Sequence, residues 1–382
     1  MLNKVFGQID TLYPHYLDLW EEFCNIESPT NYKPGVDAAG AFCAKIAKEK
    51  GWTVETLQQP VSGDVVCITM NPDAEGSMVC LSGHMDTVHP VGSFGTPAVR
   101  RDDQKMYGPG VTDCKGGIIA SLLAMDALNA CGFADRPIRL LLQTDEENGS
   151  KFSNKATIGY ICEKSTGARA FLNMEPARTN DAIVERKGII TYDFIITGQE
   201  AHASKCAEEG ASAIAEAAYK ILEMEKLKDK DGLTCSCGLI HGGSASNTVP
   251  GKCVVNVNIR YATKAQLEWV KEYAQKVANT THIPGCSCQL QQASFRVAME
   301  RVPRNLLLLE ELNNIWGNSG LSTLVAGKCT GGSDAADMTA FGVPCIDSIG
   351  ILGDKIHTPD EFAYLKSLLV AAKRAASAIL KL

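Results

Sequence analysis

The stretch Ser77–Asp86, SMVCLSGHMD, is a short apolar run that ends in two polar side chains, His84 and Asp86. A continuously apolar segment of this length is typical of a β-strand that is buried on both faces, as in parallel sheets. Open α/β sheets bind their ligands beyond the carboxyl ends of such strands. The stretch therefore predicts an α/β fold with His84 and Asp86 at a functional sheet edge.

Two further segments repeat this layout. RLLLQTDEE (139–147) ends in Glu146 and Glu147, and RAFLNMEP (169–176) carries Glu175 near its end. A single carboxylate after a strand is more often a helix cap or a surface charge. Three coincident cases instead indicate that these groups gather at one edge of the sheet and share a site.

Two more side chains complete the set, Asp113 in GPGVTDCKGG (108–117) and His357 in KIHTPDE (355–361). Imidazole and carboxylate are the ligands that zinc and similar divalent ions prefer. The whole set is large enough for two metal ions and a general base, which predicts a metal-dependent hydrolase. Its members are His84, Asp86, Asp113, Glu146, Glu147, Glu175 and His357.

Length and composition bound the remaining possibilities. A chain of 382 residues exceeds the roughly 250 to 300 at which single cores stop growing, so two domains are expected. A net charge of −7 without a basic run argues against a nucleic-acid surface. The amphipathic N-terminus lacks the features of a signal peptide, and no segment approaches the roughly 20 apolar residues of a membrane span. A cytoplasmic enzyme that binds no membrane is expected.

The fifteen cysteines lie scattered in apolar segments, which is typical of buried free thiols. Cys235 with Cys237 and Cys286 with Cys288 form C-S-C pairs, whereas zinc sites favour C-x₂₋₄-C spacing. Cys114 directly follows a candidate metal ligand, so proximity to a metal could make it reactive. The simpler interpretation of Cys114 is a tolerated small residue.

The order of predicted elements changes near residue 182. Helices and strands alternate up to Glu175, which is typical of an α/β domain. Residues 182–296 then follow a βαββαβ order, the ferredoxin-like motif, before a helix, a Gly-rich turn and a strand lead to His357. We therefore expect a catalytic domain of residues 1–181 and 297–382 with an inserted domain of residues 182–296. The second and fourth strands of such a motif lie at opposite edges, so the two C-S-C pairs should not meet.

Eight motifs, in this order, carry a resemblance over nearly the whole chain: HMDTV, GPGVTDCKGG, TDEENGS, NMEP, GQEAHAS, GGSASNTVP, CTGGSDAAD and HTPDE. The set resembles the dinuclear-zinc metallopeptidase family of bacterial glutamate carboxypeptidase, acetylornithine deacetylase, succinyl-diaminopimelate desuccinylase and aminoacylase. The resemblance implies a zinc-peptidase-like α/β catalytic domain with an inserted ferredoxin-like lid, through which two chains form a homodimer.

The same resemblance implies a role for each candidate metal ligand. Asp113 would bridge two metal ions, with His84 and Glu175 completing one site and Glu147 and His357 the other. The ions would be two Zn²⁺ per chain, with Co²⁺ or Mn²⁺ as substitutes.

Glu146 would be the general base, which needs a carboxylate beside the metals but not bound to them. Glu146 and Glu147 can divide these tasks only if the strand ends at a turn, which Asn148-Gly149 supplies. Asp86 would accept the second ring N–H of His84 and fix its tautomer.

Further residues are implied in the lid and in the turn that follows it. His202 would reach the active site of the partner chain and stabilise the oxyanion. Asn247 and Arg260 would bind the substrate carboxylate, for which the planar guanidinium is suited. Gly331, Gly332 and Ser333 resemble a loop of backbone N–H donors near the substrate.

The substrate is expected to be a small peptide or an N-acyl amino acid. Glu175 stands where aminopeptidases of this family tend to carry Asp, which favours a glutamate-carboxypeptidase-like exopeptidase, with N-acyl amino acid deacylase as the alternative. Two features depart from the family pattern. Phe152 replaces a frequent glycine, and the segment MERVPRN lacks the usual Arg-Pro pair, so Arg301 would take the place of the missing arginine at an offset position.

A catalytically silent metal-binding protein is a remote alternative. A dinucleotide-dependent oxidoreductase is disfavoured because no G-x-G-x-x-G follows the early strands.

Overall fold

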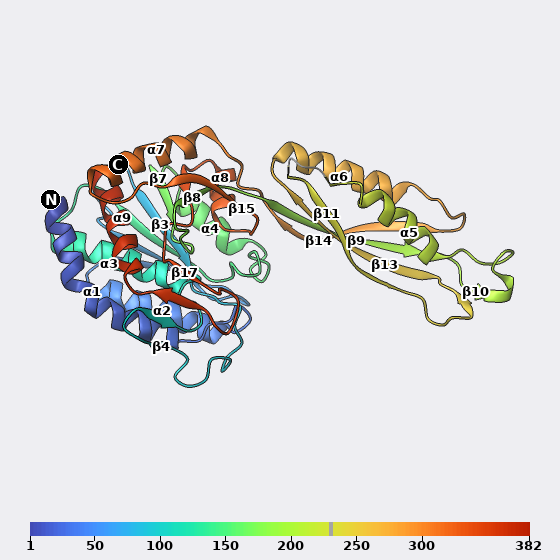
Figure 1. Cartoon of the computed structure of the whole chain (residues 1–382), viewed down its shortest axis with the longest axis horizontal. Helices are drawn as coiled ribbons and strands as arrows, with labels where there is room; N and C mark the ends of the chain where they lie inside the picture. Colours follow the sequence, from blue (N-terminus) through green and yellow to red (C-terminus); the bar gives the residue numbers. More distant parts are fainter. Residues whose placement is uncertain (229–231) are drawn as a thin grey trace. The chain divides into compact units, whose positions relative to one another are not determined.

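The computed structural model describes residues 1–228 and 232–382, which form two compact units that each have a hydrophobic core (Figure 1). The main unit consists of Met1–Val184, Arg301–Lys328 and Ser333–Leu382. The inserted unit consists of Glu185–Glu300 and Cys329–Gly332. Within the described residues, the model contains no helix that combines the length and the apolar character needed to cross a bilayer.

The main unit is built on a six-stranded sheet with the order β1-β2-β6-β3-β7-β16. Strand β3 pairs in parallel with β6 and β7, and β1, β2 and β6 pair antiparallel. Every residue of β2, β3 and β7 is buried, which confirms the prediction of strands covered on both faces. The six strands are β1 (Thr53–Leu57), β2 (Val65–Met70), β3 (Val79–His84), β6 (Ile138–Gln143), β7 (Ala170–Asn173) and β16 (Cys345–Ile346).

Helices α1, α3 and α9 pack against one another, and Figure 1 shows them together at one side of the main unit. Helix α3 is buried from Lys115 to Leu128 because α1, α9 and strand β3 surround it. A helix that is apolar all round is stable only in such a position. The helices of this unit are α1 (Leu2–Asn25), α2 (Lys33–Glu49), α3 (Lys115–Ala130), α4 (Ala156–Lys164), α7 (Pro303–Asn318), α8 (Ala335–Phe341) and α9 (Ser367–Lys381).

Smaller ladders position the loops that the sequence singles out. A four-stranded antiparallel sheet has the order β17-β18-β5-β4, and its residue Phe362 pairs with Tyr107. This pairing brings the segment after His357 beside the loop that leads to Asp113. The strands are β4 (Arg100–Arg101), β5 (Lys105–Tyr107), β17 (Gly353–Asp354) and β18 (Phe362–Tyr364), with β8 (Asp181–Arg186) and β15 (Val325–Cys329) forming a separate pair.

The inserted unit has an antiparallel sheet of order β11-β13-β9-β14, with α5 and α6 packed on it. The chain order β9-α5-β11-β13-α6-β14 confirms the ferredoxin-like motif. Because β11 and β14 are the two edges, the C-S-C pairs do not meet, and each of the fifteen cysteines carries a thiol and not a disulfide. The elements are β9 (Gly188–Thr197), β10 (Ala201–His202), a 3₁₀ turn (Ala203–Lys205), α5 (Ala213–Met224), β11 (Thr234–Gly242), β12 (Thr248–Val249), β13 (Lys252–Tyr261), α6 (Lys264–Asn279) and β14 (Ser287–Arg296).

A buried ion pair on α5 fastens the two helices of the inserted unit. Lys220 Nζ lies 3.0 Å from Glu216 Oε1 and donates to the carbonyl oxygens of Val277 and Thr280 at 2.9 Å. Glu216 Oε2 accepts the backbone N–H groups of His282 and Ile283 at 2.9 and 2.7 Å. Both charged groups are almost fully buried, at 1 and 2% exposure. The pair therefore ties α5 to the end of α6 and the loop that follows it.

Candidate metal centre

The residues predicted from strand ends do gather at one edge of the main sheet. His84 is the last residue of β3, Glu146 and Glu147 lie in the turn after β6, and Glu175 follows β7 by two residues. These three strands run parallel, so their carboxyl ends meet at the same edge. Asp113 precedes α3 and also faces this edge, where its carboxylate contacts His84.

Asp113 lies between two histidines and presents one carboxylate oxygen to each. Its Oδ1 is 3.0 Å from Nε2 of His84, and its Oδ2 is 3.1 Å from Nε2 of His357. Glu175 Oε1 lies 3.6 Å from the same nitrogen of His84, and Glu147 Oε2 lies 3.2 Å from that of His357. The five side chains thus form two groups of one histidine and one glutamate, which share Asp113.

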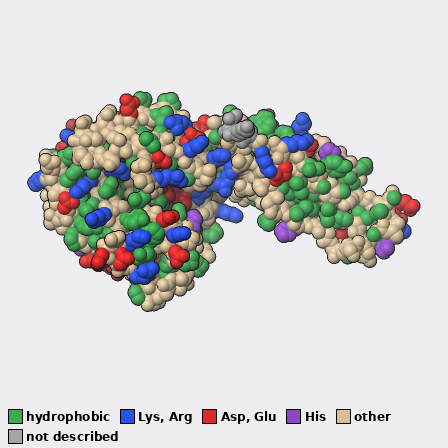
Figure 2. Space-filling model, viewed as in Figure 1, with side chains coloured by type: hydrophobic (Ala, Val, Ile, Leu, Met, Phe, Trp, Pro, Cys, Tyr) green, Lys and Arg blue, Asp and Glu red, His purple; other side chains and the backbone are tan. Residues whose placement is uncertain are grey.

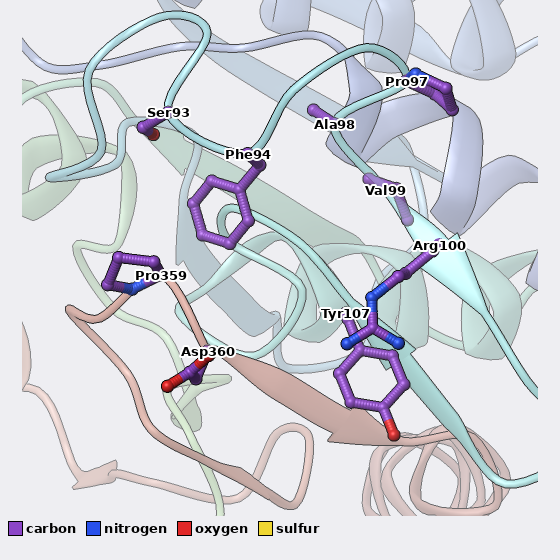
Figure 3. Close-up of a pocket in the computed structure, with 9 residues that line it drawn as sticks. All are labelled: Ser93, Phe94, Pro97, Ala98, Val99, Arg100, Tyr107, Pro359 and Asp360. Atoms are coloured by element: carbon purple, nitrogen blue, oxygen red, sulfur yellow. The ribbon is translucent and has the colours of Figure 1, made fainter.

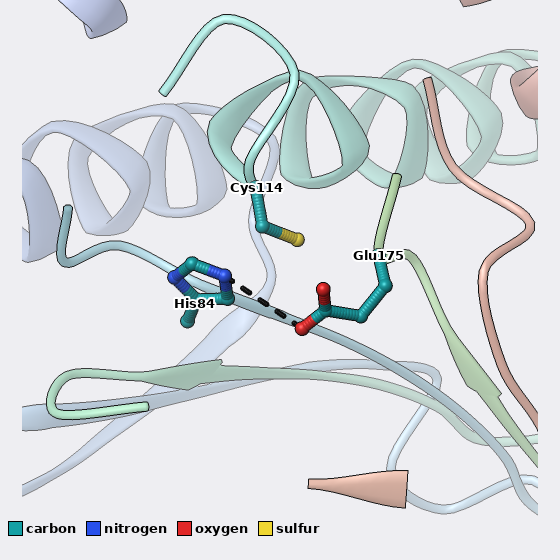
Figure 4. A group of neighbouring side chains, drawn as sticks. All are labelled: His84, Cys114 and Glu175. Carbon is teal, nitrogen blue, oxygen red and sulfur yellow. Dashed lines mark ion pairs between the residues drawn. The ribbon is translucent and has the colours of Figure 1, made fainter. Parts of the chain in front are cut away.

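The first of these groups also includes a thiol, as Figure 4 shows. Ligand atoms of His84, Cys114 and Glu175 all lie within 4.8 Å of one another. Cys114 Sγ donates to the carbonyl oxygen of Met174 at 3.3 Å, and burial raises the pKa of this thiol well above its usual range. Cys114 is fully buried and its thiol has a backbone partner, as expected for a small packed residue.

Asp86 is fully buried behind His84 and holds the turn that carries the two glutamates. Its carboxylate accepts the backbone N–H groups of Glu146 and Glu147, each at 3.2 Å, and the hydroxyl of Thr30 at 2.8 Å. Nδ1 of His84 lies 2.9 Å from the backbone oxygen of Asp86 and 3.5 Å from its carboxylate. The closer partner of the ring is therefore the backbone carbonyl, whereas the sequence analysis expects the carboxylate.

Proton affinities in the centre reflect its unbalanced charge. Hydrogen bonds to Asp113 and Glu147 raise the pKa of His357 to about 10. Burial raises the pKa of Glu147 to about 7 despite its contact with His357. Burial also raises the pKa of Asp113, but its two histidine partners outweigh this and hold the value well below its usual range.

The same imbalance affects the first group. Burial raises the pKa of Glu175 well above its usual range, and the nearby charge of Asp113 adds to the effect. Burial alone would lower the pKa of His84, but the anionic groups around its ring raise it well above normal. The directions of these shifts reflect the excess of buried carboxylates in the centre.

The donor set fits divalent metal ions. Among the described residues, Asp113, Glu147 and Glu175 form their ion pairs with His84 and His357 only. Buried carboxylates are normally balanced by cations or metals, and no lysine or arginine takes that role among these ion pairs. Oxygen and imidazole donors suit Zn²⁺, Co²⁺ or Mn²⁺. His357 is half-exposed, whereas His84 and Asp113 are buried, which leaves one side of the centre accessible.

The different roles expected for Glu146 and Glu147 require a turn at this point, and one is present. Strand β6 ends at Gln143, and the backbone N–H of Gly149 donates to the carbonyl of Glu146 at 2.7 Å. Asp145 stabilises the turn by accepting the Thr157 hydroxyl at 2.6 Å and the Ser153 N–H at 2.9 Å. The adjacent glutamates therefore follow the strand at a fixed bend.

In the inserted unit, His202 and Asn247 lie close together. β10 pairs with β12, so that His202 is opposite Thr248, and the N–H of Ala203 donates to the carbonyl of Asn247 at 2.8 Å. His202 is exposed, and its Nδ1 contacts the hydroxyl of Ser204 at 2.8 Å.

Arg260 lies near the opposite end of β13, beside the loop 329–332. It donates to the carbonyl of Thr330 at 3.1 Å, and burial followed by the charge of Arg296 lowers its pKa. Arg186 donates to the carbonyls of Gly331 and Gly332, each at 3.2 Å. Three guanidinium groups therefore surround this loop.

Gly332 and Ser333, two further residues of the predicted turn, have defined neighbours in the structure. A Cβ at Gly332 would lie 2.4 Å from Nη1 of Arg296, so the glycine leaves room for that guanidinium. Arg301, which the sequence suggests as an offset substitute, is exposed. Ser333 belongs to the main unit, where its hydroxyl accepts from the amide of Asn173 at 2.9 Å.

A surface pocket of about 190 Å³ lies between residues 93–100 and Pro359–Asp360 of the main unit. Figure 3 shows the Arg100 guanidinium over the Tyr107 ring at its side, at 3.7 Å from the ring centroid. None of the candidate metal ligands lines this pocket.

The chain matches a family model and is similar to known enzymes. The model of "Peptidase family M20/M25/M40" matches residues 80–381. Carboxypeptidase G2 from Pseudomonas sp. strain RS-16 is 28% identical over 97% of this chain and 91% of its own length. Succinyl-diaminopimelate desuccinylase from Wolinella succinogenes is 28% identical over 75% of this chain and 79% of its own.

Solved structures show the same fold at low identity. Aminopeptidase PepT from Bacillus cereus has a TM-score of 0.78 and 19% identity, covering 96% of this chain and 97% of its own. An M20 family metallo-carboxypeptidase from Sulfolobus solfataricus has a TM-score of 0.75 and 16% identity, covering 96% of this chain and 98% of its own. The family match spans most of the chain, so this protein belongs to peptidase family M20/M25/M40 and is a metal-dependent hydrolase of amide or peptide bonds.

Proposed function

We propose that this enzyme removes a C-terminal amino acid by hydrolysing the adjoining amide or peptide bond, as a glutamate-carboxypeptidase-like exopeptidase. The observation that supports it most is Asp113, which faces His84 and His357 with separate oxygens and so can join two metal sites. Similarity to carboxypeptidase G2 over 97% of the chain favours this branch of the family.

His84, Asp113 and Glu175 would hold one ion, and Glu147, Asp113 and His357 the other. When bound, such a pair of ions lowers the pKa of a water molecule and polarises the scissile carbonyl group. In the proposed assignment Zn²⁺ occupies both positions, and Co²⁺ or Mn²⁺ can replace it.

Glu146 would take the proton of the attacking water and return it to the leaving nitrogen. Its carboxylate is buried, at 6% exposure, and its backbone is held by Asp86. Both conditions suit a base that must stay beside the metals without binding them. Asp86 would act through this turn and through His84, as a positioning residue.

Arg260 would bind the carboxylate of the substrate, with Arg296 beside it. An arginine that is partly desolvated and near a second guanidinium gains most from an anionic ligand. The backbone of Gly331, Gly332 and Ser333 would supply N–H donors near the same carboxylate. A free carboxylate on the C-terminal residue is therefore the proposed requirement for the substrate.

Arg260 and Asn247 cannot bind one small substrate within the same chain. β13 starts at Lys252, and Arg260 lies eight residues further on, which is roughly 26 Å at the rise of a β-strand. Asn247 and His202 lie at the Lys252 end. The proposal that all three contact substrate therefore requires that His202 and Asn247 serve the site of a second chain.

The inserted unit offers a surface for that second chain. Edge strand β11 exposes Leu239 and Ile240, and the neighbouring α5 exposes Tyr219 and Leu222. Figure 2 shows hydrophobic side chains gathered on a face of this unit. An apolar surface beside an unpaired strand edge is typical of an interface, and we propose a homodimer.

Mixing two inactive variants tests the shared site. His202→Ala and Glu146→Ala homodimers should each have little activity, and subunit exchange should restore part of it in hybrids with one intact site. Activity would be measured after exchange, which is verified by pull-down of differently tagged chains. Verified hybrids that remain inactive would contradict the role of His202 in the partner's site.

Turnover of a small substrate panel tests the reaction itself. Folyl-glutamate, plain dipeptides, N-acetyl amino acids and succinyl-diaminopimelate would each be offered to the zinc-loaded enzyme with and without chelator. We expect chelator-sensitive release of C-terminal glutamate. Preferred cleavage of the acyl substrates would support the deacylase alternative, which the similarity to the desuccinylase favours. A protein that binds two metals and cleaves nothing would point first to a substrate outside the panel and second to the silent alternative.

A further inference from the structure

Glu361 is a buried carboxylate with no ligand role in the centre described above. It directly precedes β18 and is 1% exposed. Its Oε1 accepts the backbone N–H groups of Thr112 and Asp113 at 2.9 and 3.1 Å. Its Oε2 accepts the backbone N–H of Gly110 at 3.3 Å and faces Nε2 of His89 at 2.9 Å. Each carboxylate oxygen therefore has two hydrogen-bond partners.

The protons in this cluster can be assigned from chemistry. A carboxylate only accepts hydrogen bonds, so Nε2 of His89 carries the hydrogen that lies towards Glu361. Four N–H groups then converge on one carboxylate, and such charge-assisted bonds are roughly twice as strong as neutral ones. Three of the four donors are backbone groups in the loop that carries Asp113.

This loop has no regular structure of its own to fix Asp113. Gly110 adopts a φ of +73°, and the segment from Gly108 to Cys114 consists of turns. The N–H of Gly108 donates to the carbonyl of Glu361 at 3.2 Å, and the hydroxyl of Thr112 donates to the carbonyl of Phe362 at 2.8 Å. The segment around Glu361 therefore holds this loop along its whole length.

We infer that Glu361 is a positioning residue that sets the orientation of Asp113 and, through it, the geometry of both metal sites. This inference rests on the proposed bridging role of Asp113. A small rotation of the Asp113 backbone would displace both carboxylate oxygens together. A substitution at Glu361 would therefore alter the geometry of both metal sites. His89 adds the fourth bond to Glu361 and its ring packs edge-on against Phe94, with centroids 4.9 Å apart. It links the loop after β3 to the same carboxylate.

The test is metal binding by Glu361→Gln. An amide keeps one accepting oxygen but turns an N–H₂ group towards at least one backbone N–H. We expect the folded variant to bind Zn²⁺ about 10- to 100-fold more weakly, as is common for groups that orient metal ligands. Titration calorimetry of the metal-free protein measures this loss. The visible absorption of the Co²⁺ form should shift, and kcat should fall while KM changes little.

Glu216→Gln is the matched control, because Glu216 is also a buried carboxylate that accepts two backbone N–H bonds, but in the inserted unit. It should lower stability and leave Zn²⁺ affinity and the Co²⁺ spectrum unchanged. If Glu361→Gln fails to fold, His89→Gln replaces it, with a several-fold loss of affinity expected because three of the four bonds remain.

Three outcomes separate the possibilities. Weaker metal binding and an altered Co²⁺ spectrum in the Glu361 or His89 variant, but not in the control, support the positioning role. Wild-type affinity and spectrum in the folded variant overturn that role alone. A wild-type chain that binds no divalent metal overturns the proposed metal centre as well.

Discussion

Glu146→Gln is expected to keep both metal ions and to lose about 10²- to 10⁴-fold of its kcat, the range that general-base catalysis contributes. The amide has nearly the shape of the carboxylate but cannot take a proton from water. The backbone of residue 146 would stay in place, because its N–H still donates to Asp86. Steady-state kinetics and metal analysis of the same sample measure both parts of the prediction.

Two control variants separate a base from a ligand. Glu163→Gln changes an exposed glutamate on α4 and should leave kcat unaffected. Glu147→Gln changes a proposed ligand, so it should weaken metal binding as well as activity. If Glu146→Gln loses metal, Glu146 is a ligand, and if its kcat is unchanged, the base lies elsewhere.

Glu216→Ala is expected to destabilise the inserted unit by about 3–5 kcal/mol, the cost of leaving one partner of a buried ion pair alone. The substitution strands the ammonium of Lys220 and two backbone N–H groups, those of His282 and Ile283. Hydrogen exchange in β9 and β13 measures the opening of this unit. Since each 1.4 kcal/mol is a factor of ten, protection there should fall roughly 10²- to 10⁴-fold.

An exposed pair in the same unit is the control. Lys205 and Glu209 have the same i, i+4 spacing at 2.9 Å, but both side chains are more than half exposed. Solvent screens such pairs, so Glu209→Ala should change stability by no more than about 1 kcal/mol. Equal effects of Glu209→Ala and Glu216→Ala would show that burial of the ion pair contributes little.

Acid should reproduce part of the Glu216 effect in the wild-type chain. Burial raises the pKa of Glu216, but its bonds to Lys220, Ile283 and His282 outweigh this and lower the pKa overall. A carboxylate with a lowered folded-state pKa adds stability above its unfolded value of about 4.3, and this is lost as the pH falls through the folded value. Glu216→Ala should lack this component of the acid response.

The fold could be predicted where a regular spacing of apolar residues extends over a long segment. The segment KAQLEWVKEYAQKVAN (264–279) has the apolar spacing of a helix and coincides with α6, because the Thr263 hydroxyl accepts the Gln266 N–H and fixes its start. The helical pattern DAAGAFCAKIAKEKGW starts at Asp37, whereas α2 begins at Lys33, where Pro34 lies in its first turn. Strands of two or three residues, such as β17 and β18, have too few side chains to show an alternation of apolar and polar residues.

The candidate site was predictable where a side chain follows a buried strand, as for His84, Glu146 and Glu175. Glu361 stands in the HTPDE motif, but its role was not predictable, because three of its partners are backbone groups 248 to 251 residues away, which no spacing reveals. Asn247 and Arg260 were assigned to one carboxylate because their motifs match the family pattern. The length of β13, which places Arg260 eight residues beyond Lys252, separates them.

The interrupted layout of the main unit has a consequence for synthesis on the ribosome. The inserted unit is nearly continuous, from Glu185 to Glu300, so its core can close soon after it leaves the exit tunnel. Helices α1 and α3 emerge earlier but must wait for α9 (Ser367–Lys381), which packs against both. We therefore expect the later-translated unit to mature first, and the nascent chain to acquire its metals only near termination.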